Sequence, residues 1–190
     1  MALNLIDLEA VVVNLSKSVI KLIKDDLTAL PVDAFVFYAR EDLALGAGYG
    51  TAIQQRGGNP VRKELEAIGR IAMGQAVVTT AGAMNAGSII HACGPKFQEP
   101  DLEAKLRVCM QSALAVADRH EFRTVAFPPM GYGFYGLPLG LCGKVMLEEI
   151  AAFLEGGDRS LEEVIVCVTD KRDYDGLKGQ FEAFQSQGGQ

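Results

Sequence analysis

The chain has 190 residues, of which 49% are hydrophobic and 22% are charged, and its net charge is −6. This length and composition predict one domain over residues 1–190 with a full core, while the excess of acids and the scattered Lys and Arg exclude a surface for duplex nucleic acid. No apolar run approaches the roughly 18 residues of a membrane span, and residues 1–10 lack the basic start of a secretion signal, so we expect a cytoplasmic protein.

Along the chain, short apolar runs rich in β-branched residues alternate with segments of helical period. Expected strands cover residues 11–15, 19–23, 33–39, 75–81, 88–93, 124–128 and 164–169, and expected helices cover 49–68, 102–120, 139–154 and 174–184. This order predicts a three-layer α/β/α sandwich around a mixed, mostly parallel sheet of six or seven strands. The core spans about 11–184, and residues 185–190 form a flexible tail.

Two glycine-rich loops follow predicted strands. One lies in Ala126-Phe-Pro-Pro-Met-Gly-Tyr-Gly-Phe-Tyr-Gly-Leu-Pro138 and the other is Leu45-Gly-Ala-Gly-Tyr-Gly-Thr51. Glycines let backbone N–H groups converge on an anion, and a helix that follows adds its positive dipole end. Each loop taken alone could be a simple turn, but the pair predicts a diphosphate site where strand ends converge.

The segment Gly131–Gly136 also matches the GxGxxG pattern of nicotinamide dinucleotide domains. Its context disagrees, because that pattern belongs to the first βα turn and this one follows the sixth or seventh strand. A dinucleotide domain therefore stays only as a competing interpretation.

Acids also follow two predicted strands. Asp26 can accept a hydrogen bond from an exocyclic amine and so read adenine, or it can cap a short helical turn; both uses are compatible. Asp170, after the last strand, admits the same two interpretations.

Other chemistries find little support. The four cysteines show no CxxC spacing and sit in apolar surroundings typical of buried free thiols, and a nucleophile at Cys93 or Cys142 has no adjacent base. His91 and His120 lie far apart in sequence, so the chain offers no evident metal ligand set, and we expect no cofactor.

Several pieces in order resemble the macro domains, a family that binds ADP-ribose. Asp25–Thr28 resembles the family's Gly-Asp-Ile-Thr, and 32–36 is similar to the strand that enters its ribose-binding segment. Residues 45–53 resemble its first phosphate loop, Ile89–Pro95 its Ile-Ile-His-x-x-Gly-Pro, and 126–138 its second phosphate loop. The resemblance covers about residues 19–184 and implies the macro domain fold.

The resemblance also implies where a ligand lies. It places adenine near Asp26, the diphosphate between the two loops, and the distal ribose near residues 37–40, with Phe134 and Tyr135 as a wall. The residues expected to bind the ligand are Asp26, Leu27, Arg40, Gly46, Gly48, Tyr49, Gly50, Gly131, Tyr132, Gly133, Phe134, Tyr135 and Asp170.

Departures from the family pattern bear on catalysis. Hydrolytic members carry Asn-Ala-Ala-Asn and Gly-Val-Asp-Gly, where this chain has Phe37-Tyr-Ala-Arg40 and Gly48-Tyr-Gly-Thr51. Neither glycine nor a guanidinium serves as a general base, so the resemblance favours the reader-type members and no catalytic residue is expected. Arg40 could meet a second phosphate on an extended ligand, or pair with Glu41 or Asp42. Phe37 is expected to pack in the core.

Thr169 stands where many members place an aromatic ring against adenine, and Tyr174 is a possible substitute. We therefore expect a monomer that binds ADP-ribose or an ADP-ribosylated protein, with modest affinity. Two alternatives stay open. One is a diverged hydrolase of ADP-ribose derivatives, and the other is an interaction module that has lost its ligand.

Overall fold

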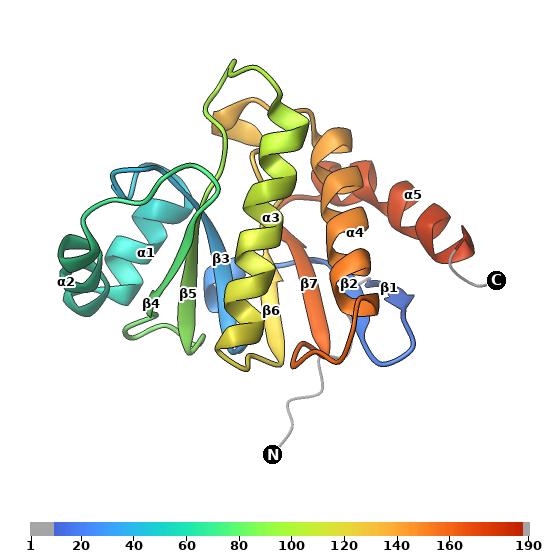
Figure 1. Cartoon of the computed structure of the whole chain (residues 1–190), viewed down its shortest axis with the longest axis horizontal. Helices are drawn as coiled ribbons and strands as arrows, with labels where there is room; N and C mark the ends of the chain where they lie inside the picture. The colour runs from blue at the N-terminus through green and yellow to red at the C-terminus, as the bar shows by residue number, and fades with distance from the viewer. Residues whose placement is uncertain (1–9, 188–190) are drawn as a thin grey trace.

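Strands and helices alternate along most of the computed structural model, which describes residues 10–187 (Figure 1). The strands are β1 (Val11–Asn14), β2 (Val19–Lys24), β3 (Ala34–Ala39), β4 (Ala76–Thr80), β5 (Ser88–Cys93), β6 (Thr124–Phe127) and β7 (Glu163–Val168). The helices are α1 (Tyr49–Gly57), α2 (Asn59–Ile68), α3 (Leu102–Arg119), α4 (Leu139–Glu155) and α5 (Lys171–Gln187), with 3-10 turns η1 (Leu27–Ala29) and η2 (Gly133–Tyr135).

The seven described strands form one mixed sheet in the order β1-β2-β7-β6-β3-β5-β4. Strands β2, β7, β6, β3 and β5 run parallel, while β1 and β4 pair antiparallel at the two edges. The predicted fold is confirmed, and the loop between β4 and β5 joins two antiparallel neighbours as a hairpin. The carboxyl ends of β3, β6 and β7 consequently meet at one edge of the sheet, where ligands collect in folds of this kind.

Apolar side chains fill both faces of the sheet, because successive residues of a strand point to opposite sides. On β3, Val36 packs in the cluster that includes residues of α3, α4 and α5, whereas Phe35 packs in the cluster that includes residues of α1 and α2. Figure 1 shows α3 and α4 in front of the sheet, with α1 and α2 beside its β4 edge. The two cores hold the strand ends in fixed relative positions.

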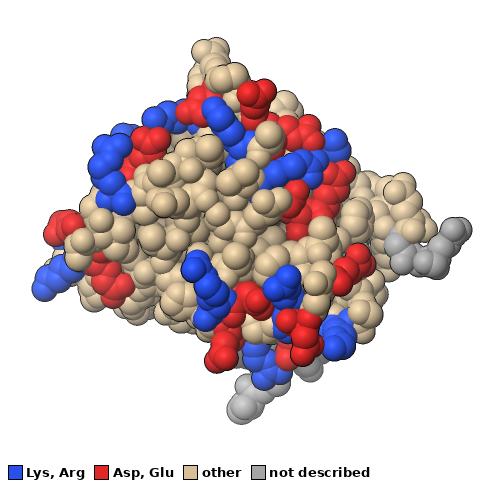
Figure 2. Space-filling view, in the orientation of Figure 1, with Lys and Arg blue, Asp and Glu red and all other residues tan. Residues whose placement is uncertain are grey.

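The space-filling view shows Lys and Arg interleaved with Asp and Glu on the face that carries α3 and α4 (Figure 2). Between these helices the Arg107 guanidinium donates hydrogen bonds to Glu103, Glu148 and Glu149. Cations that are paired with carboxylates in this way are poorly placed to contact a phosphate backbone.

Two predicted helix boundaries are wrong. The helix expected over 49–68 is divided into α1 and α2, because Gly58 adopts φ of +73° and ends α1, and α2 begins at the next residue with Pro60 in its first turn. The last helix begins at Lys171 and includes residues 185–187, which we had assigned to a flexible tail. The remaining tail residues, 188–190, and residues 1–9 of the segment compared with a secretion signal lie outside the described residues. None of the helices within residues 10–187 is long and apolar enough to cross a membrane.

Candidate ligand-binding cleft

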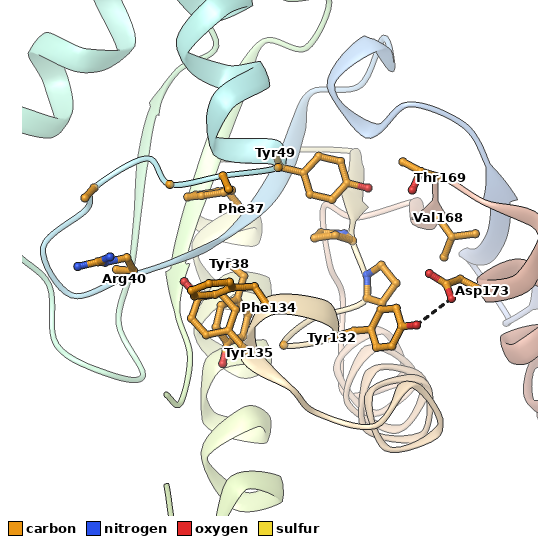
Figure 3. A pocket seen from close by; sticks show the side chains of 17 residues that line it. Phe37, Tyr38, Arg40, Tyr49, Tyr132, Phe134, Tyr135, Val168, Thr169 and Asp173 are labelled. Carbon is orange, nitrogen blue, oxygen red and sulfur yellow. Dashed lines mark hydrogen bonds between the residues drawn. The ribbon is translucent and has the colours of Figure 1, made fainter. Parts of the chain in front are cut away.

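A cleft of about 320 Å³ opens where β3, β6 and β7 end. Its lining comes from residues 37–49, from 128–135 and from the β7–α5 corner at 168–173. Figure 3 shows side chains from all three segments around the same space. The two glycine-rich loops that the sequence analysis assigned to one ligand therefore line one cleft.

Positive backbone angles shape both loops. Gly48 has φ of +65° immediately before α1, and Gly131 and Gly133 have φ of +80° and +77° in the second loop. Residues with a Cβ rarely adopt this region, so the loop paths depend on glycine. The first loop delivers the N-terminus of α1 to the cleft, and N–H groups at such a terminus attract anions.

Eight of the thirteen predicted binding residues line the cleft: Arg40, Gly46, Gly48, Tyr49, Gly131, Tyr132, Phe134 and Tyr135. Leu27 does not line it, since its side chain is fully buried in the core, and Gly50 is packed against the backbone of Leu45. Gly133 and Asp170 are adjacent in sequence to residues that line the cleft, but they do not line it themselves. The Asp170 carboxylate accepts a hydrogen bond from the Asp173 N–H at 2.9 Å, the capping use that we weighed against ligand binding.

Asp26 also stands outside the cleft lining and caps η1. Its Oδ1 accepts hydrogen bonds from the Thr28 N–H at 3.0 Å and the Thr28 hydroxyl at 2.7 Å, and its Oδ2 accepts one from the Arg56 guanidinium at 2.5 Å. Burial alone would raise the pKa of Asp26, but these hydrogen bonds and the Arg56 charge lower it overall. The capping interpretation is confirmed, and the contact with adenine stays a prediction.

Arg40 lines the cleft at the end of β3 and is half-exposed. Its guanidinium donates two hydrogen bonds to the Asp42 carboxylate, at 3.0 and 2.8 Å, so the pairing considered in the sequence analysis is present. The bonds from Arg40 hold the pKa of Asp42 below its usual range. Arg40, Phe134 and Tyr135 also border a second hollow that contains Arg70 and Lys96.

Aromatic rings dominate the cleft, and four of the chain's five tyrosines line it. Phe37 was expected to pack in the core and was not named as a binding residue, but its ring both packs there and lines the cleft. Tyr38 lies in the segment 37–40 expected near the distal ribose but was not named as a binding residue. Its hydroxyl donates to the Pro95 carbonyl at 2.5 Å, and its ring centroid lies 4.3 Å from that of Tyr135. Phe134 is 86% exposed at the cleft mouth.

Tyr174 is the residue that we proposed as a substitute for an adenine-stacking ring, and this prediction is wrong. Its side chain, in the first turn of α5, is only 2% exposed and packs in the core. Thr169 does line the cleft, and the Tyr49 hydroxyl points toward it (Figure 3).

The β7–α5 corner contributes an acid that the sequence analysis did not single out. Of the described residues, Asp173 alone brings a carboxylate to the cleft lining, and its Oδ1 accepts a hydrogen bond from the Tyr132 hydroxyl at 2.9 Å. This bond raises the pKa of Tyr132. An acid in the first turn of a helix normally indicates capping, so the sequence carried no signal that would have separated Asp173 from its neighbours.

Among residues 10–187, no histidine or cysteine lines the cleft. His91 is buried on β5, where its Nε2 lies 2.8 Å from the Thr79 hydroxyl, and burial lowers its pKa to about 4. All four cysteines are free and buried, as expected, and burial raises the pKa of Cys93 to about 11 and that of Cys142 to about 12. Within residues 10–187 no three His, Cys, Asp or Glu side chains gather as a metal site would require.

Comparisons with known proteins agree with this architecture. Residues 38–146 match the family model described as "Macro domain". A Pantoea vagans protein named O-acetyl-ADP-ribose deacetylase 1 is 32% identical over 162 residues, which cover 82% of this chain and 94% of the relative.

Two solved structures resemble this chain. The Oceanobacillus iheyensis macrodomain with ADP superposes with a TM-score of 0.89 at 23% identity, over 95% of this chain and 99% of that one. The Trypanosoma brucei macrodomain in complex with ADP-ribose has a TM-score of 0.79 at 25% identity, over 85% and 68%.

Proposed function

The chain belongs to the macro domain family, and from this premise we propose that its cleft binds ADP-ribose, or a related nucleotide diphosphate, without hydrolysing it. The observation that carries the proposal is the meeting of two glycine loops around one cleft. Their N–H groups suit a diphosphate, because hydrogen bonds that backbone N–H groups donate to charged phosphate oxygens are stronger than those between neutral groups. The chain acts as a monomer and needs no cofactor for this.

The remaining lining suggests the direction of the ligand. The diphosphate lies between the loops at Gly48 and Gly131, with the adenosine toward the β7–α5 corner and the distal ribose toward Arg40. Phe134 and Tyr135 are in edge contact, with ring centroids 5.3 Å apart, and offer that distal ribose an aromatic wall. When the ligand is an ADP-ribosylated protein, the polypeptide attached to the distal ribose would extend out of the cleft beside Phe134.

Two features support binding over hydrolysis. Asp173 and Arg40 lie at opposite ends of the cleft in Figure 3, so the carboxylate of the lining is remote from the distal ribose. Two acids follow Arg40 in sequence. Glu41 pairs with Arg70 and Lys96, and Asp42 accepts two hydrogen bonds from Arg40 that lower its pKa. A carboxylate held in this way is a weak general base.

A second candidate function is hydrolysis of an ADP-ribose derivative, which the name of the Pantoea vagans relative favours. Single-turnover assays on labelled ADP-ribosyl protein and on O-acetyl-ADP-ribose separate the candidates. We expect no release above the blank without enzyme, and release faster than the blank would replace the reader proposal with the hydrolase.

Calorimetric titration tests the binding proposal directly. ADP-ribose, ADP, NAD and ADP-ribose phosphate are titrated in parallel, and we expect saturable binding of ADP-ribose with a Kd below about 1 mM, which corresponds to roughly −4 kcal/mol. The absence of heat at millimolar ADP-ribose would contradict the proposal and favour an interaction module without a ligand.

The adenine contact of Asp26 gives a separate prediction. Asp26→Ala should weaken ADP-ribose binding about tenfold, because a lost hydrogen bond to a carboxylate costs about 1.5 kcal/mol or more, and should lower folding stability by about 1 kcal/mol through loss of the η1 cap. Titration with ADP-ribose measures the first effect, and urea unfolding the second.

Arg56→Gln is the matched control, since it breaks the ion pair with Asp26 but keeps the carboxylate. We expect its affinity for ADP-ribose to equal or exceed that of the natural chain. Unchanged affinity in Asp26→Ala would remove Asp26 from the binding site.

A further inference from the structure

Asp173 is nearly buried, with 9% of the residue exposed, and yet it lines the cleft. Its Oδ1 accepts the hydrogen bond of Tyr132 at 2.9 Å and lies 3.5 Å from the Arg172 Nε. A carboxylate that is largely withdrawn from water is costly unless donors surround it. Its retention at this position therefore calls for an explanation.

Capping of α5 does not supply that explanation. The N–H of Asp173 is already satisfied by the carboxylate of Asp170 at 2.9 Å, so Asp170 performs the local capping role. The side chain of Asp173 instead points toward Tyr132, which belongs to the second glycine loop and lies at the same end of the cleft (Figure 3). The bond thus links the β7–α5 corner to the loop that we assign to the diphosphate.

The chemistry of the site limits what the carboxylate can meet. Phosphate oxygens repel it, so its partner on the ligand must be a hydrogen-bond donor. The donors next to a nucleoside diphosphate are the hydroxyls of the ribose, and a carboxylate accepts well from such a pair, as Asp or Glu does in dinucleotide-binding folds. Because Tyr132 sits in the phosphate loop itself, the group one step from it is the sugar and not the base.

From this juxtaposition we infer that Asp173 reads the ribose hydroxyls of the adenosine, with Tyr132 as the residue that positions its carboxylate. The inference rests on the proposed function and deepens it, since it makes the cleft selective for ribonucleotides over deoxyribonucleotides. It assigns Asp173 a place beside the ribose and leaves the adenine edge to Asp26.

Calorimetric titration with ADP, 2′-deoxy-ADP and 3′-deoxy-ADP tests the inference. The natural chain should bind ADP about tenfold more tightly than the more weakly bound deoxy analogue, the scale expected for one hydrogen bond to a charged group. Asp173→Asn should bind the more weakly bound deoxy analogue with the same affinity as the natural chain, but its preference for ADP over that analogue should fall to about twofold. Tyr132→Phe should give an intermediate preference, because it frees the carboxylate without removing it.

Asp175→Asn is the matched control, as Asp175 lies on α5, is about half exposed and pairs with Lys171 away from the cleft lining. It should keep the full preference for ADP. Circular dichroism and thermal unfolding show that each variant is folded.

Three results would overturn the inference while the proposed function stands. They are equal affinity of the natural chain for all three nucleotides, an undiminished preference in folded Asp173→Asn, and an equal loss of affinity for ADP and both analogues in that variant. Failure of the natural chain to bind ADP-ribose or ADP at all would overturn both.

Discussion

Gly48→Val should abolish ADP-ribose binding, with Kd raised at least about 100-fold, or roughly 2.7 kcal/mol. Gly48 has φ of +65° at the start of α1, and a Cβ placed there meets no atom within 4 Å. The valine methyl groups would therefore occupy open space beside the N–H groups that we assign to the diphosphate, and the loop would relax away from its present path. Calorimetric titration with ADP-ribose measures the loss.

Gly69→Val is the control for backbone strain. Gly69 has φ of +77° after α2, its Cβ position is equally open, and it lies outside the cleft lining. Both variants should lose about 1–3 kcal/mol of unfolding free energy, because both place a β-branched residue in the left-handed region. Only Gly48→Val should lose binding. Equal affinity in the two variants would show that the first glycine loop does not hold the ligand.

The location of the cleft could be predicted from the sequence because its determinants are local. Apolar runs followed by glycines indicate strands that end in turns, and the parallel order of the strands brings such turns to one edge of the sheet. The loops at Gly48 and Gly131 line the same cleft, as that reasoning requires. The division of the segment 49–68 at Gly58 was also open to prediction, because adjacent glycines at 57 and 58 followed by Asn59-Pro60 are turn signals that outweigh the helical period on either side.

The partners of the polar side chains could not be predicted, because they come from distant parts of the chain. Arg56 reaches Asp26 across 30 positions, and Tyr132 reaches Asp173 across 41. Asp173 and Asp170 are alike in sequence terms, and only the position of α5 against the second loop brings Asp173 to the cleft lining. Phe37 was assigned to the core for a different reason: the edge of a core and the wall of a cleft are both apolar, so residue type alone does not distinguish them.

Gly82→Ala should lower the unfolding free energy by about 3 kcal/mol or more, which combines left-handed strain with overpacking. Gly82 lies in the β4–β5 loop with φ of +63°, and a Cβ there would overlap the backbone of Gly57 at the end of α1. The atoms that this Cβ would overlap all belong to the main chain of Gly57, so no side chain can move aside and α1 must shift as a unit to relieve the overlap. Urea unfolding with an unchanged m value measures the stability loss.

Because α1 also carries Gly48 at its start, its displacement should weaken ADP-ribose binding even though Gly82 is outside the cleft lining. Gly69→Ala separates strain from overlap, as it shares the positive φ but has open space around its Cβ, and it should cost about 1 kcal/mol. Equal stability losses in the two variants would mean that the contact between Gly57 and Gly82 does not hold α1 against the β4–β5 loop. A large stability loss in Gly82→Ala together with undiminished affinity would mean that the position of α1 does not set the first phosphate loop.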